Sequence, residues 1–301
     1  MYELSILSLI SLCLVSFIGV PHGSFDGAVA ALLGYQSKKR FLTFIFWYMI
    51  ISIAVIFFWI QFSLIALFLF IIMSIIHFGL CDWSFLKINQ FKWIVTLTHG
   101  FNIVFGIIFF HTPESFQIFT FLSNKNFIFF EQYLFVVYFL FGILFLIYCY
   151  LSINLKKLRW GILEMISLLL IISQLDPLTG FALYFCFIHT TKHVYAILKN
   201  TNKYLENKKF VFTTTAVFTI ITWVGGCIAI IYLNDNFSFS ESFIKTIFIG
   251  LAALTLPHMT LIDFFYRKNL IKKIGYFKDN IFIFFIVDHF WFIIFFNSIN
   301  K

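Results

Sequence analysis

Residues 41–80 read FLTFIFWYMIISIAVIFFWIQFSLIALFLFIIMSIIHFGL, and this stretch decides the fold. It contains no Asp, Glu, Lys or Arg. A helix needs about 20 apolar residues to cross a hydrocarbon core of roughly 30 Å, so this run is too long for a single crossing. The run therefore predicts two membrane-spanning helices that meet near Gln61.

Apolar runs of similar length recur along the whole chain. Hydrophobic residues make up 61% of the sequence and charged residues 11%, whereas about a quarter of an average soluble domain is charged. The sequence predicts an all-α, polytopic transmembrane helical bundle of about ten helices, with eight to ten as the range, in a single integral membrane domain over residues 1–301. The expected spans are 3–21, 41–60, 63–80, 93–111, 131–152, 159–174, 177–198, 211–233, 243–263 and 281–298.

Basic residues predict the orientation of these spans, because short cytoplasmic loops are enriched in Lys and Arg. With the N-terminus outside, all but four of the 21 basic residues fall in inner loops. The exceptions are Lys125, Lys192, Lys245 and Lys301. The net charge of +8 thus reports orientation and does not indicate nucleic-acid binding. We expect a multi-pass protein of the cell (inner) membrane with both termini outside.

Five histidines fall near the inner ends of the odd-numbered spans, at one common depth. They are His22, His77, His189, His193 and His258. His189 and His193 are four residues apart, so they share one helix face, as a metal-binding pair requires. With His22 and His77 they supply four neutral nitrogens that could hold one divalent metal. The alternative is that these polar residues only reach interfacial water, although ionisable residues inside a membrane are functional by default.

Two aspartates follow the first two of these histidines. Asp26 stands four residues after His22, and Asp82 stands five after His77. Metal-bound histidines usually donate their second N–H to a carboxylate or carbonyl. Both aspartates are therefore candidate orienting residues, or else solvated residues at helix exits. His111 falls at an outer span end, so we expect it to lie outside the site.

Four motifs resemble those of a known family. They are PHGSFDG at 21–27, HFGLCD at 77–82, HTTKH at 189–193 and LPHM at 256–259. Their order and spacing resemble the Brp/Blh family of bacterial β-carotene 15,15'-dioxygenases. The resemblance implies a polytopic membrane enzyme that uses non-haem Fe(2+) and O2 to split β-carotene at its central double bond into two all-trans-retinal. A microbial opsin is then a candidate acceptor of the retinal.

The resemblance also implies roles for single residues. It implies iron ligation by His22, His77, His189 and His193, with His258 as a substrate-side or supporting residue. The family often has His directly after the Asp of the first motif and Trp before the first His of the third, where this chain has Gly27 and Ile188. Neither departure removes a proposed metal ligand, so they affect the expected identity of the substrate more than that of the metal.

Other functions compete with this interpretation. A membrane desaturase or hydroxylase also uses histidines, but its di-iron site needs about eight of them in clustered boxes, and this chain has a single HxxxH pair. A non-catalytic carotenoid-binding or transport membrane protein is a further alternative. The 47 phenylalanines fit a slot for a flat conjugated ligand, or simply lipid-facing packing.

Overall fold

The computed structural model describes residues 4–86, 91–204 and 208–266, and the regular structure within these ranges is entirely helical. The prediction of an all-α fold is therefore confirmed. The α-helices are α1 (Ile6–Leu14), α2 (Asp26–Leu32), α3 (Lys38–Gln61), α4 (Ser63–Leu86), α5 (Lys92–Phe110), α6 (Thr112–Ser123), α7 (Glu131–Asn154), α8 (Lys156–Ile172), α9 (Pro177–Ala182), α10 (Thr190–Tyr204), α11 (Lys208–Leu233) and α12 (Phe239–Met259). Shorter 3-10 or π-helical segments are η1 (Val15–Gly19), η2 (Val20–Phe25), η3 (Phe127–Phe130), η4 (Leu183–His189) and η5 (Thr260–Tyr266).

The two predicted breaks within long apolar stretches are both present. α3 ends at Gln61 and α4 begins at Ser63. At the second break, the Asp176 carboxylate accepts hydrogen bonds from the backbone N–H groups of Leu178 and Thr179, at 3.1 and 3.2 Å. This N-cap, followed by a proline at the first helical position, starts α9.

Seven helical segments of the described ranges are long and apolar enough to cross a membrane. They are Ile6–Leu32, Lys38–Gln61, Ser63–Ser84, Lys92–Phe110, Glu131–Asn154, Lys209–Leu233 and Phe239–Asp263. Large apolar side chains are also exposed on α7 and α11, such as Phe135, which is 76% exposed, and exposed apolar surface along helices of this length and composition is typical of contact with lipid. The chain is therefore a helical membrane protein.

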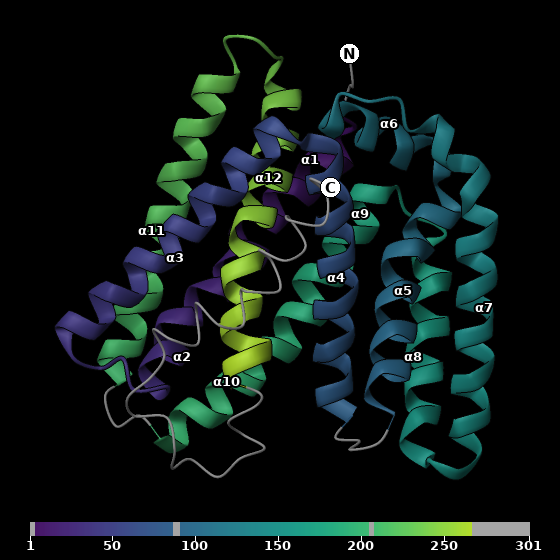
Figure 1. Ribbon diagram of the computed structural model, residues 1–301, viewed down its shortest axis with the longest axis horizontal. Helices are drawn as coiled ribbons and strands as arrows, with labels where there is room; N and C mark the ends of the chain where they lie inside the picture. Colours follow the sequence, from purple (N-terminus) through teal and green to yellow (C-terminus); the bar gives the residue numbers. More distant parts are fainter. Residues whose placement is uncertain (1–3, 87–90, 205–207, 267–301) are drawn as a thin grey trace, which may run out of the picture.

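The count of about ten spans and the outside N-terminus stay predictions. The expected spans 159–174 and 177–198 are helical, as α8 and the run from α9 to α10, but they are not among the seven. The span expected over 281–298 lies outside the described residues. α6 was not expected, and it lies at the end of the bundle where α1 begins (Figure 1).

α4 and α12 lie at the centre of the bundle (Figure 1). On one side α12 packs against α3 and α11, and on the other α4 packs against α5, which contacts α7 and α8. Glycines let α4 and α5 approach backbone to backbone: a Cβ on Gly79 would lie 1.8 Å from the Thr96 carbonyl oxygen, and one on Gly100 would lie 1.9 Å from that of Ile75. Small residues permit such close packing of membrane helices.

Candidate metal centre

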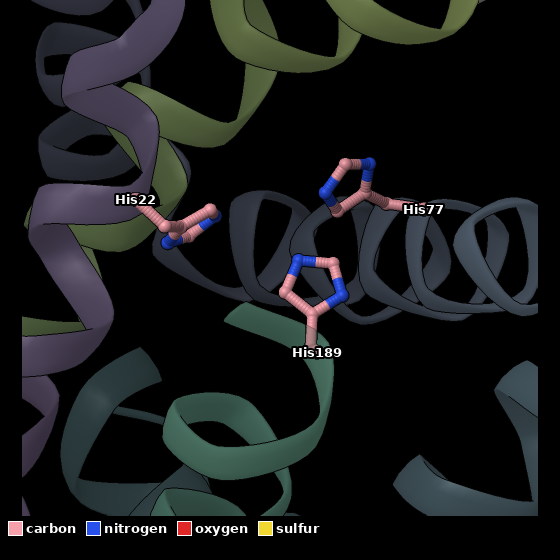
Figure 2. A group of neighbouring side chains, drawn as sticks. All are labelled: His22, His77 and His189. Atoms are coloured by element: carbon pink, nitrogen blue, oxygen red, sulfur yellow. The ribbon is translucent and has the colours of Figure 1, made fainter. Parts of the chain in front are cut away.

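Three buried histidines from distant parts of the chain meet at the centre of the bundle. His22 comes from η2, His77 from α4 and His189 from the last position of η4. One ring nitrogen from each lies within 4.8 Å of the other two. Figure 2 shows the three rings turned toward one another. Such a group of nitrogens has the donor type and spacing to hold one metal ion.

Two further buried histidines border this group. The ring centroid of His193 lies 5.4 Å from that of His22, and the ring centroid of His258 lies 5.0 Å from that of His77. His193 and His258 are themselves 4.9 Å apart. The structure thus brings together all five histidines that were expected at one depth. We call His22, His77, His189, His193 and His258 the histidine cluster.

Irregular helical turns carry two of these side chains and follow a third. η1 is π-helical and directly precedes η2, which contains Pro21 and His22. Pro21 has no N–H and its ring clashes with the carbonyl four residues earlier, so a regular α-helix is disfavoured there. η4 is also π-helical and ends at His189, and the π-helical η5 follows His258. Such single-turn π segments are frequent at functional sites.

Hydrogen bonds hold three of the rings through their Nδ1 atoms. The Nδ1–H of His22 donates to the Gly19 carbonyl, and that of His77 donates to Asp263 Oδ2 at 2.9 Å. The Nδ1–H of His258 donates to the Asp26 carboxylate at 2.8 Å. This arrangement fixes the tautomer in which Nε2 carries a lone pair, as in metal-bound histidines.

Asp26 and Asp82, the two candidate orienting residues, both bind a histidine, but not the one that precedes them in the sequence. Asp26 is fully buried, but it binds His258 and accepts a hydrogen bond from the Tyr48 hydroxyl at 2.9 Å, and it does not bind His22. The reason is local: the chain from His22 to Asp26 runs through a 3-10 helix, in which three residues complete a turn, so a spacing of four does not align the two side chains.

Asp82 is not the partner of His77 either. Five positions along an α-helix rotate a side chain well away from the starting face, and Asp82 instead binds Lys192 Nζ at 2.7 Å and His99 Nδ1 at 3.4 Å. Lys192 also pairs with Glu164, and His99 Nε2 bonds the Tyr148 hydroxyl at 2.9 Å. We call Asp82, His99, Tyr148, Glu164 and Lys192 the Asp82 network.

The carboxylate beside His77 is Asp263, which sequence reasoning missed. Its side chain is only 2% exposed. The sequence did offer one sign of this role, because Asp263 is a carboxylate at the end of an apolar span. Ionisable groups inside membranes are costly unless they have a partner. His111 binds the Ile172 carbonyl oxygen at 3.1 Å and is not part of the histidine cluster. His289 lies outside the described residues.

The family model described as Beta-carotene 15,15'-dioxygenase matches residues 13–266. The chain belongs to this family. A curated relative named "Beta-carotene 15,15'-dioxygenase", from Uncultured marine bacterium 66A03, is 30% identical over 261 residues, which cover 86% of this chain and 94% of the relative. No solved structure matches the chain. The family resemblance of the motifs is confirmed, and the chain is an oxidoreductase of the dioxygenase family.

An apolar cavity of about 50 Å³ adjoins the cluster of this dioxygenase-family member. His22, His77 and His258 line it together with aromatic side chains. The aromatic residues of its wall are Tyr48, Phe70, Phe78, Phe181, Phe185 and Phe218. These three histidines therefore line a space that suits an apolar ligand, because pockets for such ligands combine many apolar walls with a few polar groups.

Proposed function

We propose that this chain cleaves the central 15,15' double bond of β-carotene with O2 to give two all-trans-retinal. The carbon–carbon double bond breaks, and each of its carbons receives one oxygen atom of O2 as an aldehyde, so the reaction needs no external electron or proton. The observation that carries the proposal is a group of converging histidine nitrogens beside a phenylalanine-lined cavity in a membrane protein of this family.

We further propose that His22, His77, His189 and His193 hold one Fe(2+) ion. Imidazole is a suitable ligand for iron, and the Nδ1 anchors of His22 and His77 leave their Nε2 atoms for a metal. His193 Nε2 is buried and has no hydrogen-bond partner among the described residues. When bound, the iron would supply the activation of O2.

The residues around the ligands would hold the histidine rings in place and orient the substrate. Gly19 and Asp263 hold the rings of two ligands in place. Tyr48 and Asp26 fix His258, which we assign to the substrate side of the cluster. Since β-carotene has no polar group, the phenylalanine walls would orient it by shape and exclude water from the reacting bond.

The cellular setting follows from the same proposal. The substrate is taken up from the lipid bilayer, and retinal, which is also apolar, returns there and can be passed to a microbial opsin. We place the chain in the cell (inner) membrane as one domain of about ten helices with its N-terminus outside, on the distribution of basic residues. No nucleic acid takes part.

The decisive experiment is expression in a bacterium that produces β-carotene. The cells should lose their yellow-orange colour while retinal accumulates, and the purified protein should contain about one iron per chain, as a mononuclear site requires. Cells with an empty vector are the control. Folded protein that leaves β-carotene intact would contradict the proposed reaction, and active protein without metal would contradict the proposed iron site.

A further inference from the structure

A second apolar cavity adjoins the one beside the histidines. Its volume is about 80 Å³, and none of its lining residues is a histidine. The wall comes from α4, α5, α6, α9 and α12, and includes Ile107 of α5, Ile118 of α6 and Leu178 of α9. We call this space the α6 cavity, and the first one the histidine cavity.

The two cavities share part of their wall. Phe70, Ser74, Phe78 and Phe181 line both. The first three are spaced four residues apart, so they form one stripe along α4. The Ser74 hydroxyl donates to the Phe70 carbonyl oxygen at 2.8 Å, so the shared wall offers no unsatisfied polar group at this position. The cavities are therefore neighbours across a thin, mainly aromatic partition.

The histidine cavity also extends in the opposite direction. Phe218 and Thr222 of α11 and Leu254 of α12 line it and do not line the α6 cavity. α11 and α6 lie on opposite sides of the central helices α4 and α12 (Figure 1). His77 and His258, which those central helices carry, thus lie between two apolar spaces.

A substrate that is cut at its centre needs room for two equal halves, one on each side of the reacting bond. We propose that the α6 cavity holds one half of β-carotene while the part of the histidine cavity toward α11 holds the other, so that the depth of the α6 cavity sets which double bond reaches the metal. This inference rests on the proposed function.

Aromatic geometry agrees with a conjugated occupant. The rings of Phe181 and Phe185 are stacked at 5.3 Å and 12°, and those of Phe181 and Phe248 at 6.1 Å and 28°. These stacked rings form a continuous aromatic wall along the two cavities, against which an apolar polyene can pack. The cavities, of about 50 and 80 Å³, are smaller than the substrate. The side chains that line and divide the two spaces must therefore move apart when the polyene binds.

The test fills the α6 cavity and compares two substrates. Ile118→Phe adds bulk to its wall, whereas Leu122→Phe adds bulk one turn further along α6, at a buried position that lines neither cavity. Each purified, iron-loaded variant is assayed with β-carotene and with a β-apocarotenal that has one intact half and one shortened half. The amount of folded protein is measured by size-exclusion chromatography.

Ile118→Phe is expected to lower β-carotene turnover by about tenfold and to leave apocarotenal turnover within about twofold, because a filled pocket rejects only the longer group. Leu122→Phe should leave the ratio of the two rates unchanged. Equal changes of both rates in Ile118→Phe would overturn the inference. Wild-type protein that cleaves neither substrate would instead refute the proposed function.

A second measurement uses the wild-type chain and does not depend on a variant that folds. β-Carotene with a photoreactive diazirine on its end ring is bound and irradiated, and the labelled peptides are identified by mass spectrometry. One group of labelled peptides is expected from α5 or α6, which line the α6 cavity, and a second group from α11. Label on α11 alone would overturn the assignment of the α6 cavity.

Discussion

Two buried polar clusters meet at the helical turn that carries HTTKH. The histidine cluster receives His189 and His193 from this turn, while the Asp82 network receives Lys192. In the Asp82 network opposite charges are paired, since Lys192 Nζ lies 2.7 Å from Asp82 Oδ1 and also binds Glu164. In the histidine cluster, Gly19, Asp26 and Asp263 all accept hydrogen bonds from Nδ1–H groups of the histidines.

This difference indicates that the Asp82 network has a structural role and that the histidine cluster binds a ligand. An unpaired charge or polar atom costs free energy when it is buried. In the Asp82 network the ion pairs of Lys192 with Asp82 and Glu164 offset this cost. The histidine cluster brings one ring nitrogen from each of three histidines within 4.8 Å of one another, and imidazole nitrogens are suitable ligands for a metal cation. The two clusters should therefore respond differently to substitution.

The largest effect is expected from His77→Ala, because it removes one of the three nitrogens that lie within 4.8 Å of one another. Iron content should fall from about one per chain to near zero, and retinal formation should stop, since an incomplete ligand set does not retain the ion. Elemental analysis of purified protein and chromatography of retinal measure these outcomes. The same result is expected for His22, His189 and His193.

His111→Ala is the matched control, because His111 binds the Ile172 carbonyl and lies outside the cluster. It should keep both iron and activity. A His77→Ala protein with full iron and activity would remove His77 from the ligand set, and an inactive His111→Ala protein that folds normally would contradict the proposed topology.

The next effect concerns stability, and it should come from Lys192→Met. This change leaves Asp82, whose side chain is 4% exposed, without its closest positive charge. Removing one partner of a buried pair costs roughly 3–5 kcal/mol. Unfolding of the detergent-solubilised protein by sodium dodecyl sulfate measures the loss, while iron per folded chain should stay near the wild-type value.

A double-mutant cycle gives the control. Adding Asp82→Asn to Lys192→Met removes the uncompensated charge, so part of the lost stability should return. If the double variant were as unstable as the sum of the two single variants, the two residues would not be coupled and the structural role of the Asp82 network would be wrong.

The sequence predicted the helices better than it predicted their contacts. Run length and the breaks at Gln61 and Pro177 depend on bilayer thickness and backbone chemistry, which are local properties. The gathering of histidines was also predictable, because the alternating direction of the spans sets their depth. The spacing of His189 and His193 and the shared depth of His22 and His77 pointed to four of them as ligands of one metal, and the family resemblance implied that this metal is iron.

The partners of those histidines could not be predicted, because they depend on how far each helix is rotated about its axis. The π-helical segment before His22 and the 3-10 segment that contains it change that rotation, so the spacing of four residues does not bring Asp26 to His22. Asp263 reaches His77 from a helix 186 positions further along the chain. Only the packing of α12 and η5 against α4 brings these two side chains together.

A smaller effect is expected from Asp263→Asn, which keeps the size of the side chain and removes its charge. The bond to His77 Nδ1, now 2.9 Å, should weaken, and loss of such an orienting partner lowers metal affinity by about 10- to 100-fold. Competition with a chelator measures iron affinity directly.

Asp26→Asn makes the same change beside His258. Since His258 is outside the proposed ligand set, iron affinity should stay near the wild-type value while β-carotene turnover falls. Equal losses of iron affinity in the two variants would instead make His258 a ligand. The pair of variants thus decides which histidines face the metal and which face the substrate.

The last substitution in this series is Gly79→Ala, at a position between the two clusters on α4, two residues after His77 and three before Asp82. The added methyl group would meet the Thr96 carbonyl at 1.8 Å, so α4 and α5 must separate. Overpacking of this kind costs about 1–3 kcal/mol, and unfolding in sodium dodecyl sulfate measures it.

Gly142→Ala on α7 is the control, because no atom lies within 4 Å of its added Cβ. It should be neutral or stabilise the helix by up to about 1 kcal/mol, since Ala has the higher helix propensity. Separation of α4 from α5 also moves the helix that carries His77 and Asp82, so Gly79→Ala should lower iron affinity as well as stability. A loss of stability with unchanged iron affinity would mean that the histidine cluster tolerates movement of α4, and that the α4–α5 contact supports the Asp82 network alone.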